Sequence, residues 1–265
     1  MESLSRLASI VAKLRSPGGC PWDRAQTFDS LKPFLLEECY EVLEALDRRD
    51  YDALPSELGD LLLQIFLQAE LASEQGLFDI RRVADLIAEK LERRHPHVFA
   101  QAQARTPAEV LELWRRLKRE ETGRSPEDES RLAGIPLALP ALQRAQKLQA
   151  RAAAAGFDWQ HAQGALQQLL SELEELEQAR QAQPPGALAD ELGDLLFSLV
   201  NLARFLGVDA ESALRQACRK FETRFRAAEA LAHAQGTDLE SLSAEELDRL
   251  WRAAKDQETK PESGP

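Results

Sequence analysis

Apolar residues recur every three or four positions along nearly the whole chain, as in FLLEECYEVLEAL at residues 34–46. This spacing places them on one face of an α-helix. Aromatic residues make up only 6% of the sequence and β-branched residues rarely follow one another, so strands are not indicated. The sequence therefore predicts an all-α protein.

Proline and glycine divide the helical pattern into segments. The breaks fall at residues 17–19, Pro55, Gly76, Pro107 and residues 184–186. The polar stretch ETGRSPEDESRLAGIP is the best candidate for a link between domains. We therefore expect an N-terminal domain over residues 1–121, a linker over 122–136, a C-terminal domain over 137–257 and a flexible tail over 258–265.

The six-residue word ELGDLL occurs twice, at residues 57–62 and 191–196. It belongs to a longer internal repeat, in which four acidic residues recur 134 positions later. The first set is Glu38, Glu41, Glu57 and Asp60, and the second set is Glu172, Glu175, Glu191 and Asp194. A basic pair recurs 130 positions later, first as Lys90 and Arg94 and then as Lys220 and Arg224. The sequence thus predicts two tandem helical-hairpin repeats.

Each copy carries two acidic pairs, and the members of a pair are three residues apart. On a helix this spacing leaves the two side chains about 60° apart, hence on one face. The turn between the pairs makes a helical hairpin, in which four carboxylates can converge. Helical angles place Glu38 and Glu172 beside the apolar stripe, whereas Glu37 and Glu174 point away from it.

Two interpretations of these carboxylates are open. Glutamate is a good helix former, so charged runs usually form solvated helix faces. Alternatively, four carboxylates at the edge of a core repel one another and lose hydration, and a bound cation compensates for both effects. An all-oxygen ligand set suits Mg²⁺, with Mn²⁺ as a substitute, and does not suit zinc. The repetition of the set favours the metal site.

A di-iron carboxylate bundle is a competing metal site, but it needs paired Glu-x-x-His motifs. Only Glu92 with His95 forms such a motif, and its counterpart in the second copy ends in Phe225. We therefore interpret the histidines as structural or surface residues, with a substrate contact at His95 as the alternative.

Positive charge suited to phosphate follows each acidic hairpin. Lys220 with Arg224, like Lys90 with Arg94, shares one helix face at i,i+4 spacing. An ordinary exposed basic face has the same pattern, and the repetition after each hairpin is what favours phosphate binding. The chain has no Walker-type glycine-rich loop, no G-x-S-x-G elbow and no G-x-G-x-x-G fingerprint.

Overall charge and cysteine content narrow the choice of partners and compartment. The formal net charge of -12 argues against nucleic acid or an anionic membrane as a partner. Cys20, Cys39 and Cys218 have no paired spacing, so we expect free thiols in a reducing cytosol. Neither a signal-peptide core nor a run of about 18 apolar residues occurs, which favours a cytoplasmic location.

Several motifs give the chain a resemblance to a known family. They are GGCPWDRAQTFDSL, EECYE with ELGD, KLERRHPHVF, RAAAAGFDW and KFETRF. With them the chain resembles the two-repeat, full-length type of MazG nucleoside triphosphate pyrophosphohydrolase, in the all-α NTP pyrophosphatase group. The group's pattern, E-E-x-x-E followed by a spacer and E-x-x-D, is complete in the first copy, whereas Ser171 replaces the leading Glu in the second.

The resemblance implies Mg²⁺-dependent hydrolysis of a nucleoside triphosphate to the monophosphate and pyrophosphate, as nucleotide-pool housekeeping. It implies that both acidic sets bind metal and that the second set, Glu172, Glu175, Glu191 and Asp194, is catalytic. Gln168, Glu172 and Glu191 would border the nucleotide. Lys220 and Arg224 would stabilise the phosphate chain, with Lys90 and Arg94 as their counterparts, and Trp251 would stack on the base. The family also implies a homodimer, whose formation completes a helical bundle.

The second copy is expected to carry most of the hydrolysis. Pro96 should end the first basic helix near Arg94 and change the direction in which the side chains at that end of the helix point. Two-repeat relatives of the family are likewise credited with hydrolysis mainly in the second half. The alternative function is a non-catalytic helical scaffold, or a nucleotide-sensing regulatory protein, that retains the repeat. Both acidic sets are intact, and this favours the enzyme.

Overall fold

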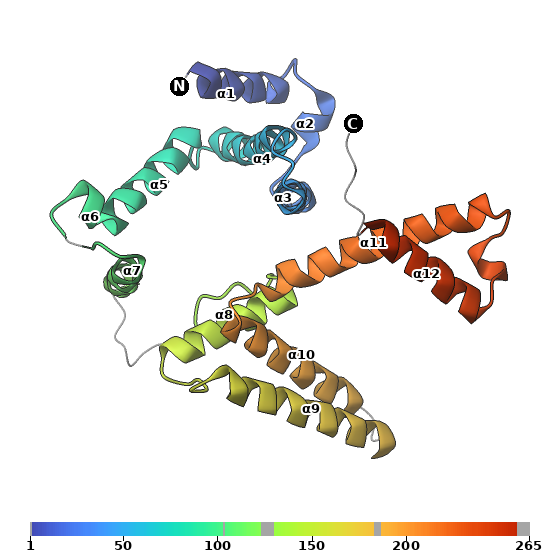
Figure 1. The fold of residues 1–265 in the computed structure, drawn as a ribbon. Helices are drawn as coiled ribbons and strands as arrows, with labels where there is room; N and C mark the ends of the chain where they lie inside the picture. The colour runs from blue at the N-terminus through green and yellow to red at the C-terminus, as the bar shows by residue number, and fades with distance from the viewer. Residues whose placement is uncertain (1, 103, 123–129, 183–186, 259–265) are drawn as a thin grey trace. The chain divides into compact units, whose positions relative to one another are not determined.

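The computed structural model describes residues 2–102, 104–122, 130–182 and 187–258, and within these ranges every regular element is a helix (Figure 1). The all-α prediction is therefore confirmed for this part of the chain. The chain divides into two compact units, Met1–Ser125 and Pro126–Pro265. The domain boundaries expected from the sequence, including the linker over 122–136 and the tail over 258–265, stay a prediction, because much of both segments lies outside the described residues.

Helices of the first unit end where the sequence places its breakers. They are α1 (Glu2–Arg15), α2 (Pro21–Ala25), α3 (Leu31–Arg48), α4 (Leu54–Glu74), α5 (Ile80–Arg94), α6 (Pro96–Phe99) and α7 (Pro107–Thr122). Pro55 lies in the first turn of α4 and Pro107 opens α7, where the missing N–H of proline costs nothing. Gly76 follows α4 with φ +69°, a left-handed conformation that stops the helix.

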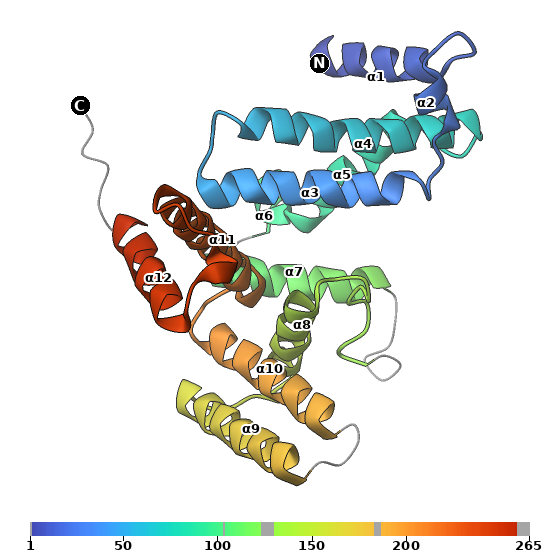
Figure 2. The same ribbon diagram turned by 90° about the vertical axis from the view of Figure 1, so that its right-hand side faces the viewer.

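The core of the first unit lies between α1, α3 and α4. The helices α3 and α4 form a hairpin and run side by side (Figure 2), and α1 packs across α4. Val11, Leu31, Phe66, Leu67 and Leu71 form the buried cluster. A two-pronged ion pair fixes α1 on α4: Arg15 Nε and one terminal nitrogen donate to the two oxygens of Glu74 at 2.8 and 2.7 Å.

Helices of the second unit repeat the hairpin. They are α8 (Ala141–Ala154), α9 (Ala162–Ala182), α10 (Ala187–Phe205), α11 (Ala210–Ala234), the 3-10 turn η1 (Leu239–Ser241) and α12 (Ala244–Glu258). The helices α9 and α10 pair closely, and α8 packs on α10. The predicted break at residues 184–186 lies outside the described residues. The helices α11 and α12 pack on each other through Ala228, Ala232, Leu250 and Ala254.

The internal repeat is visible in the helix caps. Asp79 and Asp209, 130 positions apart, precede α5 and α11, and each side chain accepts a hydrogen bond from the backbone N–H three residues on. The copies differ at the other end of these helices. Pro96 lies two residues after Arg94, where α5 ends, whereas α11 continues to Ala234. The expected effect of Pro96 on helix length is confirmed.

The second hairpin exposes an apolar stripe. It consists of leucines on both helices: Leu170, Leu173, Leu188, Leu192, Leu196 and Leu199. Leu170 is 52% exposed and Leu199 is 50% exposed, which is high for side chains beside a core. Contiguous exposed apolar surface of this kind is typical of interaction surfaces. Among the described helices, none has both the length and the apolar character needed to cross a membrane.

Candidate carboxylate site

The second hairpin gathers carboxylates from both of its helices. Glu172 and Glu175 lie on α9, and Glu191 lies on α10. One oxygen of each can be chosen so that all three lie within 4.8 Å of one another. Asp194 lies close enough for its charge to raise the pKa of Glu191. The structure therefore brings the predicted second set together at the place that the internal repeat indicates.

Hydrogen bonds along α9 fix two of these carboxylates. Gln168 Nε2 donates to Glu172 Oε1 at 2.7 Å, and the Ser171 hydroxyl donates to Glu175 Oε1 at 3.1 Å. Both donors lie one turn before their acceptor, on the same helix face. Ser171, which departs from the acidic motif, thus supports a carboxylate instead of adding one. The sequence analysis missed this role, although the i,i+4 spacing is visible in the sequence.

Burial and charge repulsion both act on the pKa of Glu191. Burial raises the pKa of this carboxyl above its ordinary value, and the charges of Glu175, Asp194 and Glu172 raise it further. Glu191 is half-buried, so water screens the repulsion between it and the neighbouring carboxylates only in part. The cluster is therefore strained in its fully ionised form, and a cation would relieve that strain.

The first hairpin shows the same electrostatics. Burial is the largest cause that raises the pKa of Glu38 and of Glu57, and the charges of Glu41 and Asp60 add to both shifts. Gln64 Nε2 donates a long hydrogen bond, 3.5 Å, to Glu38 Oε1. Within the described residues, no three carboxylates of this copy come as close together as the trio of the second copy. The first set is gathered more loosely.

Burial separates the predicted site carboxylates from their neighbours in sequence. Glu172 is half-buried, whereas Glu174, two residues on, is exposed. Glu177, also on α9, pairs with Arg180 at 2.6 Å, and the hydrogen bond from Arg180 lowers the pKa of Glu177 to about 2. In the first copy Glu38 is half-buried and Glu37 is exposed. The helical-angle argument is therefore confirmed for Glu38 and Glu172.

The donor set fits a hard divalent cation. All the gathered atoms are carboxylate oxygens, and neither histidine nor cysteine is part of the trio. Carboxylate oxygens are the ligands that Mg²⁺ and Mn²⁺ prefer. Burial and, after it, the charges of the neighbouring carboxylates raise the pKa of Glu191, and a bound cation would offset both effects. Magnesium itself stays a prediction, because the same oxygens suit several hard ions.

The predicted phosphate- and base-binding residues lie on other helices. Lys220 and Arg224 are on α11, which begins beside α8 and α10 and then runs away from α9 (Figures 1 and 2). Trp251 on α12 packs against Phe221 of α11, with ring centroids 5.3 Å apart. The basic pair and Trp251 thus share one end of the unit, while the carboxylates occupy the hairpin.

The counterparts in the first unit have a similar position. Lys90 and Arg94 lie on α5, which continues from the end of α4 and leaves the α3–α4 hairpin (Figure 1). His95 follows Arg94 and packs edge-on against Trp114 at 5.0 Å between ring centroids, and its Nδ1 lies 2.7 Å from the carbonyl oxygen of Leu91. These contacts support the structural interpretation of His95.

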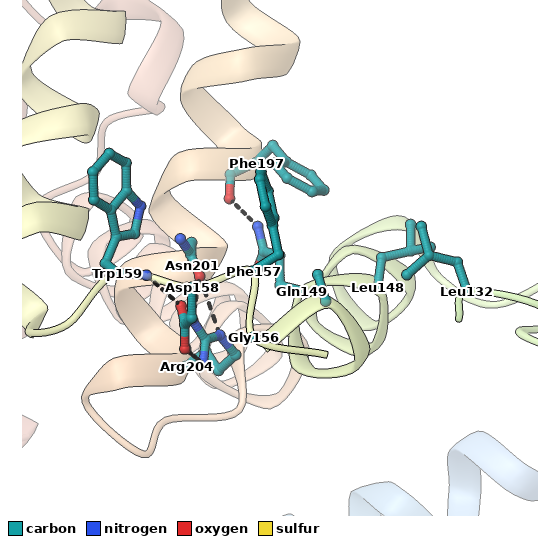
Figure 3. A pocket seen from close by; sticks show the side chains of 11 residues that line it. Leu132, Leu148, Gln149, Gly156, Phe157, Asp158, Trp159, Phe197, Asn201 and Arg204 are labelled. Atoms are coloured by element: carbon teal, nitrogen blue, oxygen red, sulfur yellow. Dashed lines mark hydrogen bonds and ion pairs between the residues drawn. The ribbon is translucent and has the colours of Figure 1, made fainter. Parts of the chain in front are cut away.

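A cavity of about 540 Å³ lies beside α8 and α10 (Figure 3), and none of the predicted site residues belongs to its lining. Its lining consists of Leu132, Leu148, Gln149, Ala152, Gly156, Phe157, Asp158, Trp159, Phe197, Asn201 and Arg204. Most polar groups of the lining pair with one another: Arg204 donates to Asp158 and Asn201, and Gln149 Nε2 donates to the carbonyl oxygen of Phe197 at 2.7 Å. The Oε1 of Gln149 is buried without a hydrogen-bond partner among the described residues. The cavity is therefore distinct from the carboxylate site, although both use α10.

Comparison with known proteins gives a consistent result. A model of the MazG nucleotide pyrophosphohydrolase domain matches residues 26–99 and 160–227, which include both acidic sets and both basic pairs but not Trp251. The chain is 46% identical over 261 residues to the nucleoside triphosphate pyrophosphohydrolase of Escherichia coli K12, covering 97% of this chain and 99% of that protein. It is 47% identical over 249 residues to the nucleoside triphosphate pyrophosphohydrolase/pyrophosphatase MazG of Thermotoga maritima, covering 94% of each.

Proposed function

Because this chain belongs to the MazG family and is a nucleoside triphosphate pyrophosphohydrolase, we propose that its second acidic hairpin carries the reaction. The products are a nucleoside monophosphate and pyrophosphate, and the role is control of the nucleotide pool in the cytoplasm. The observation that carries this proposal is the trio Glu172, Glu175 and Glu191, whose oxygens gather within 4.8 Å. The free thiols of Cys20, Cys39 and Cys218 are compatible with a reducing compartment.

The proposed metal ligands are the four carboxylates of each copy, with Mg²⁺ as the physiological ion and Mn²⁺ as a substitute. A bound divalent cation supplies charge neutralisation of phosphate oxygens and acidifies a bound water. The Gln168 and Ser171 side chains keep Glu172 and Glu175 oriented through their hydrogen bonds. A carboxylate of the set that keeps one oxygen free of the metal ion would accept the proton of the attacking water. Cleavage between the α- and β-phosphates then releases pyrophosphate.

We further propose that the enzyme is a homodimer. The leucine stripe of α9 and α10 lies next to the carboxylates on both helices, and exposed leucines of this number favour association. A second copy that covers the stripe would complete a bundle of four helices around the site. Since α11 leaves the hairpin of its own chain, the dimer also offers a way to bring Lys220, Arg224 and Trp251 to a nucleotide.

Light scattering coupled to size exclusion tests the dimer. The native chain should elute at twice the mass of 29.6 kDa. Leu199→Glu, a change within the stripe, should shift it to a monomer, because a buried unpaired carboxylate opposes association. Leu137→Glu is the matched control, since Leu137 is exposed but lies outside the hairpin. Elution of the native protein at the mass of one chain, 29.6 kDa, would overturn the dimer.

Product analysis tests the reaction itself. The chain is incubated with each nucleoside triphosphate and Mg²⁺, and the products are separated by anion exchange. Equal amounts of monophosphate and pyrophosphate are expected. Orthophosphate with a nucleoside diphosphate as the products would contradict the proposed function, because the bond cleaved would then be the one between the β- and γ-phosphates.

A further inference from the structure

Gln64 is a buried polar residue beside the first acidic set. It lies on α4, one turn after Asp60, and only 6% of it is exposed. Its Nε2 donates to Glu38 Oε1 at 3.5 Å. Its Oε1 is buried and accepts no hydrogen bond within the part of the chain that the structure describes. Burying an amide oxygen without a partner costs about 1–3 kcal/mol, so this atom calls for an explanation.

The second copy holds the equivalent carboxylate in a different way. Glu172 corresponds to Glu38, and it receives its hydrogen bond from Gln168 on its own helix. In the first copy the position of Gln168 is taken by Phe34, which packs against the core. Conversely, the position of Gln64 is taken by Ser198 in the second copy. Each copy thus provides one glutamine amide for the equivalent carboxylate. The amide comes from the second helix of the hairpin in the first copy and from the first helix in the second copy.

We propose that Gln64 is a positioning residue of the first acidic set, with the same task that Gln168 has in the second. The amide N–H holds Glu38, and the amide oxygen would serve as a hydrogen-bond acceptor toward the hydration of a cation held by the first set. This inference rests on the proposed metal role of the first set. It adds a residue that lies outside the acidic motif and explains why a polar side chain is kept in the interior of α4.

A hydrogen bond to a metal-binding carboxylate restricts the carboxylate to the orientation that the ion requires. Loss of such a partner typically weakens metal binding about 10- to 100-fold. The long contact of 3.5 Å is consistent with a set that is gathered loosely before the ion binds. Burial of Gln64 also means that water cannot easily replace its amide, so the effect of removing it should be large.

Manganese binding to the full chain tests this role. The parent protein carries Glu172→Gln/Glu175→Gln, so that Mn²⁺ titrated by electron paramagnetic resonance reports on the first set. Adding Gln64→Met keeps the side-chain volume but removes both amide atoms, and the dissociation constant should rise about 10- to 100-fold. Gln68→Met, one turn further along α4, is the matched control and should leave binding unchanged. Helical circular dichroism should be the same in all three proteins.

A transplanted amide separates positioning from core packing. Phe34→Gln added to the Gln64→Met protein places an amide where the second copy has Gln168, and it should recover a large part of the lost Mn²⁺ affinity. Should that protein fail to fold, the mirror variant replaces it. Gln168→Met in a chain with Glu38→Gln/Glu41→Gln should weaken Mn²⁺ binding at the second set by a similar factor.

The outcomes distinguish the inference from the proposed function. Unchanged Mn²⁺ affinity in Gln64→Met would overturn the positioning role alone. A parent protein that binds no Mn²⁺ would overturn the metal role of the first set, and the inference with it. Recovery by the transplanted amide would support the role, because a residue needed only for packing does not produce it. A loss in the mirror variant would support the premise that a glutamine amide orients this carboxylate in the second copy, and no loss there would remove that premise.

Discussion

Gln168 Nε2 and Glu172 Oε1 are joined by a hydrogen bond of 2.7 Å between successive turns of α9. The bond orients this half-buried carboxylate, which lies next to Glu175 and Glu191. The family resemblance assigns Gln168 to the border of the nucleotide. The observed contact gives this side chain a second task that does not need the nucleotide, namely to orient a carboxylate before any ligand binds.

Neutralising a gathered carboxylate should stop turnover without unfolding the chain. Glu172→Gln or Asp194→Asn removes a ligand charge worth several kcal/mol to the reaction, so kcat should fall at least about 100-fold. The fold should persist, because each change relieves repulsion within the cluster. Pyrophosphate release and helical circular dichroism measure the two effects.

The exposed neighbour Glu174 provides the control. Glu174→Gln changes the same charge on the same helix but on the solvent side, so its activity should stay within about twofold of the native value. Equal loss of activity in Glu174→Gln and Glu172→Gln would mean that overall charge, and not the facing of the carboxylates, controls the reaction.

Metal removal should abolish activity reversibly. Without a cation the carboxylates only repel one another, and nothing neutralises the substrate phosphates. Dialysis against EDTA should eliminate pyrophosphate release, and added Mg²⁺ or Mn²⁺ should restore it. Ca²⁺ is a useful comparison, since it binds oxygen ligands with looser geometry and longer bonds. Full activity in excess EDTA would refute the metal role.

The raised pKa of Glu191 has a consequence for stability. Because folding raises this pKa above the ordinary value, the folded chain binds the proton more tightly than the unfolded chain does. The stabilising contribution is complete below the unfolded value of about 4.5 and is lost as the pH rises through the folded pKa. The metal-free protein should therefore lose thermal stability as the pH rises above this window.

Glu191→Gln should flatten that pH dependence and raise the unfolding temperature of the metal-free protein at neutral pH, because the repulsion with Glu175, Asp194 and Glu172 disappears. The same variant should lose the stabilisation by Mg²⁺ that the native chain shows. Differential scanning calorimetry with and without Mg²⁺ measures both effects. A variant that is less stable than the native chain without metal would contradict the repulsion.

The two copies should contribute unequally to hydrolysis. Glu172→Gln/Glu175→Gln removes ligands from the tightly gathered second set, and it should eliminate nearly all pyrophosphate release. Glu38→Gln/Glu41→Gln acts on the looser first set and should retain most of the activity. The reverse result would assign the reaction to the first copy, whose basic helix ends at Arg94.

The sequence by itself determined the local structure and the identity of the acidic residues. Helix ends follow from Pro96, Pro107 and Gly76, because proline and left-handed glycine act on the backbone within one turn. The helical period decided which acids lie beside the core, so the half-buried Glu38 and the exposed Glu37 were separable without a structure. The internal repeat identified the four carboxylates of each copy as one group.

Only the tertiary structure decided what supports those carboxylates and what lies far from them. Gln64 reaches Glu38 from the other helix, across 26 positions, and no periodicity within one helix indicates such a contact. Lys220 and Arg224 follow the hairpin in sequence, yet α11 carries them away from α9 (Figure 1). A helical pattern fixes the face that each residue occupies, but the direction in which one helix leaves another depends on packing between distant segments.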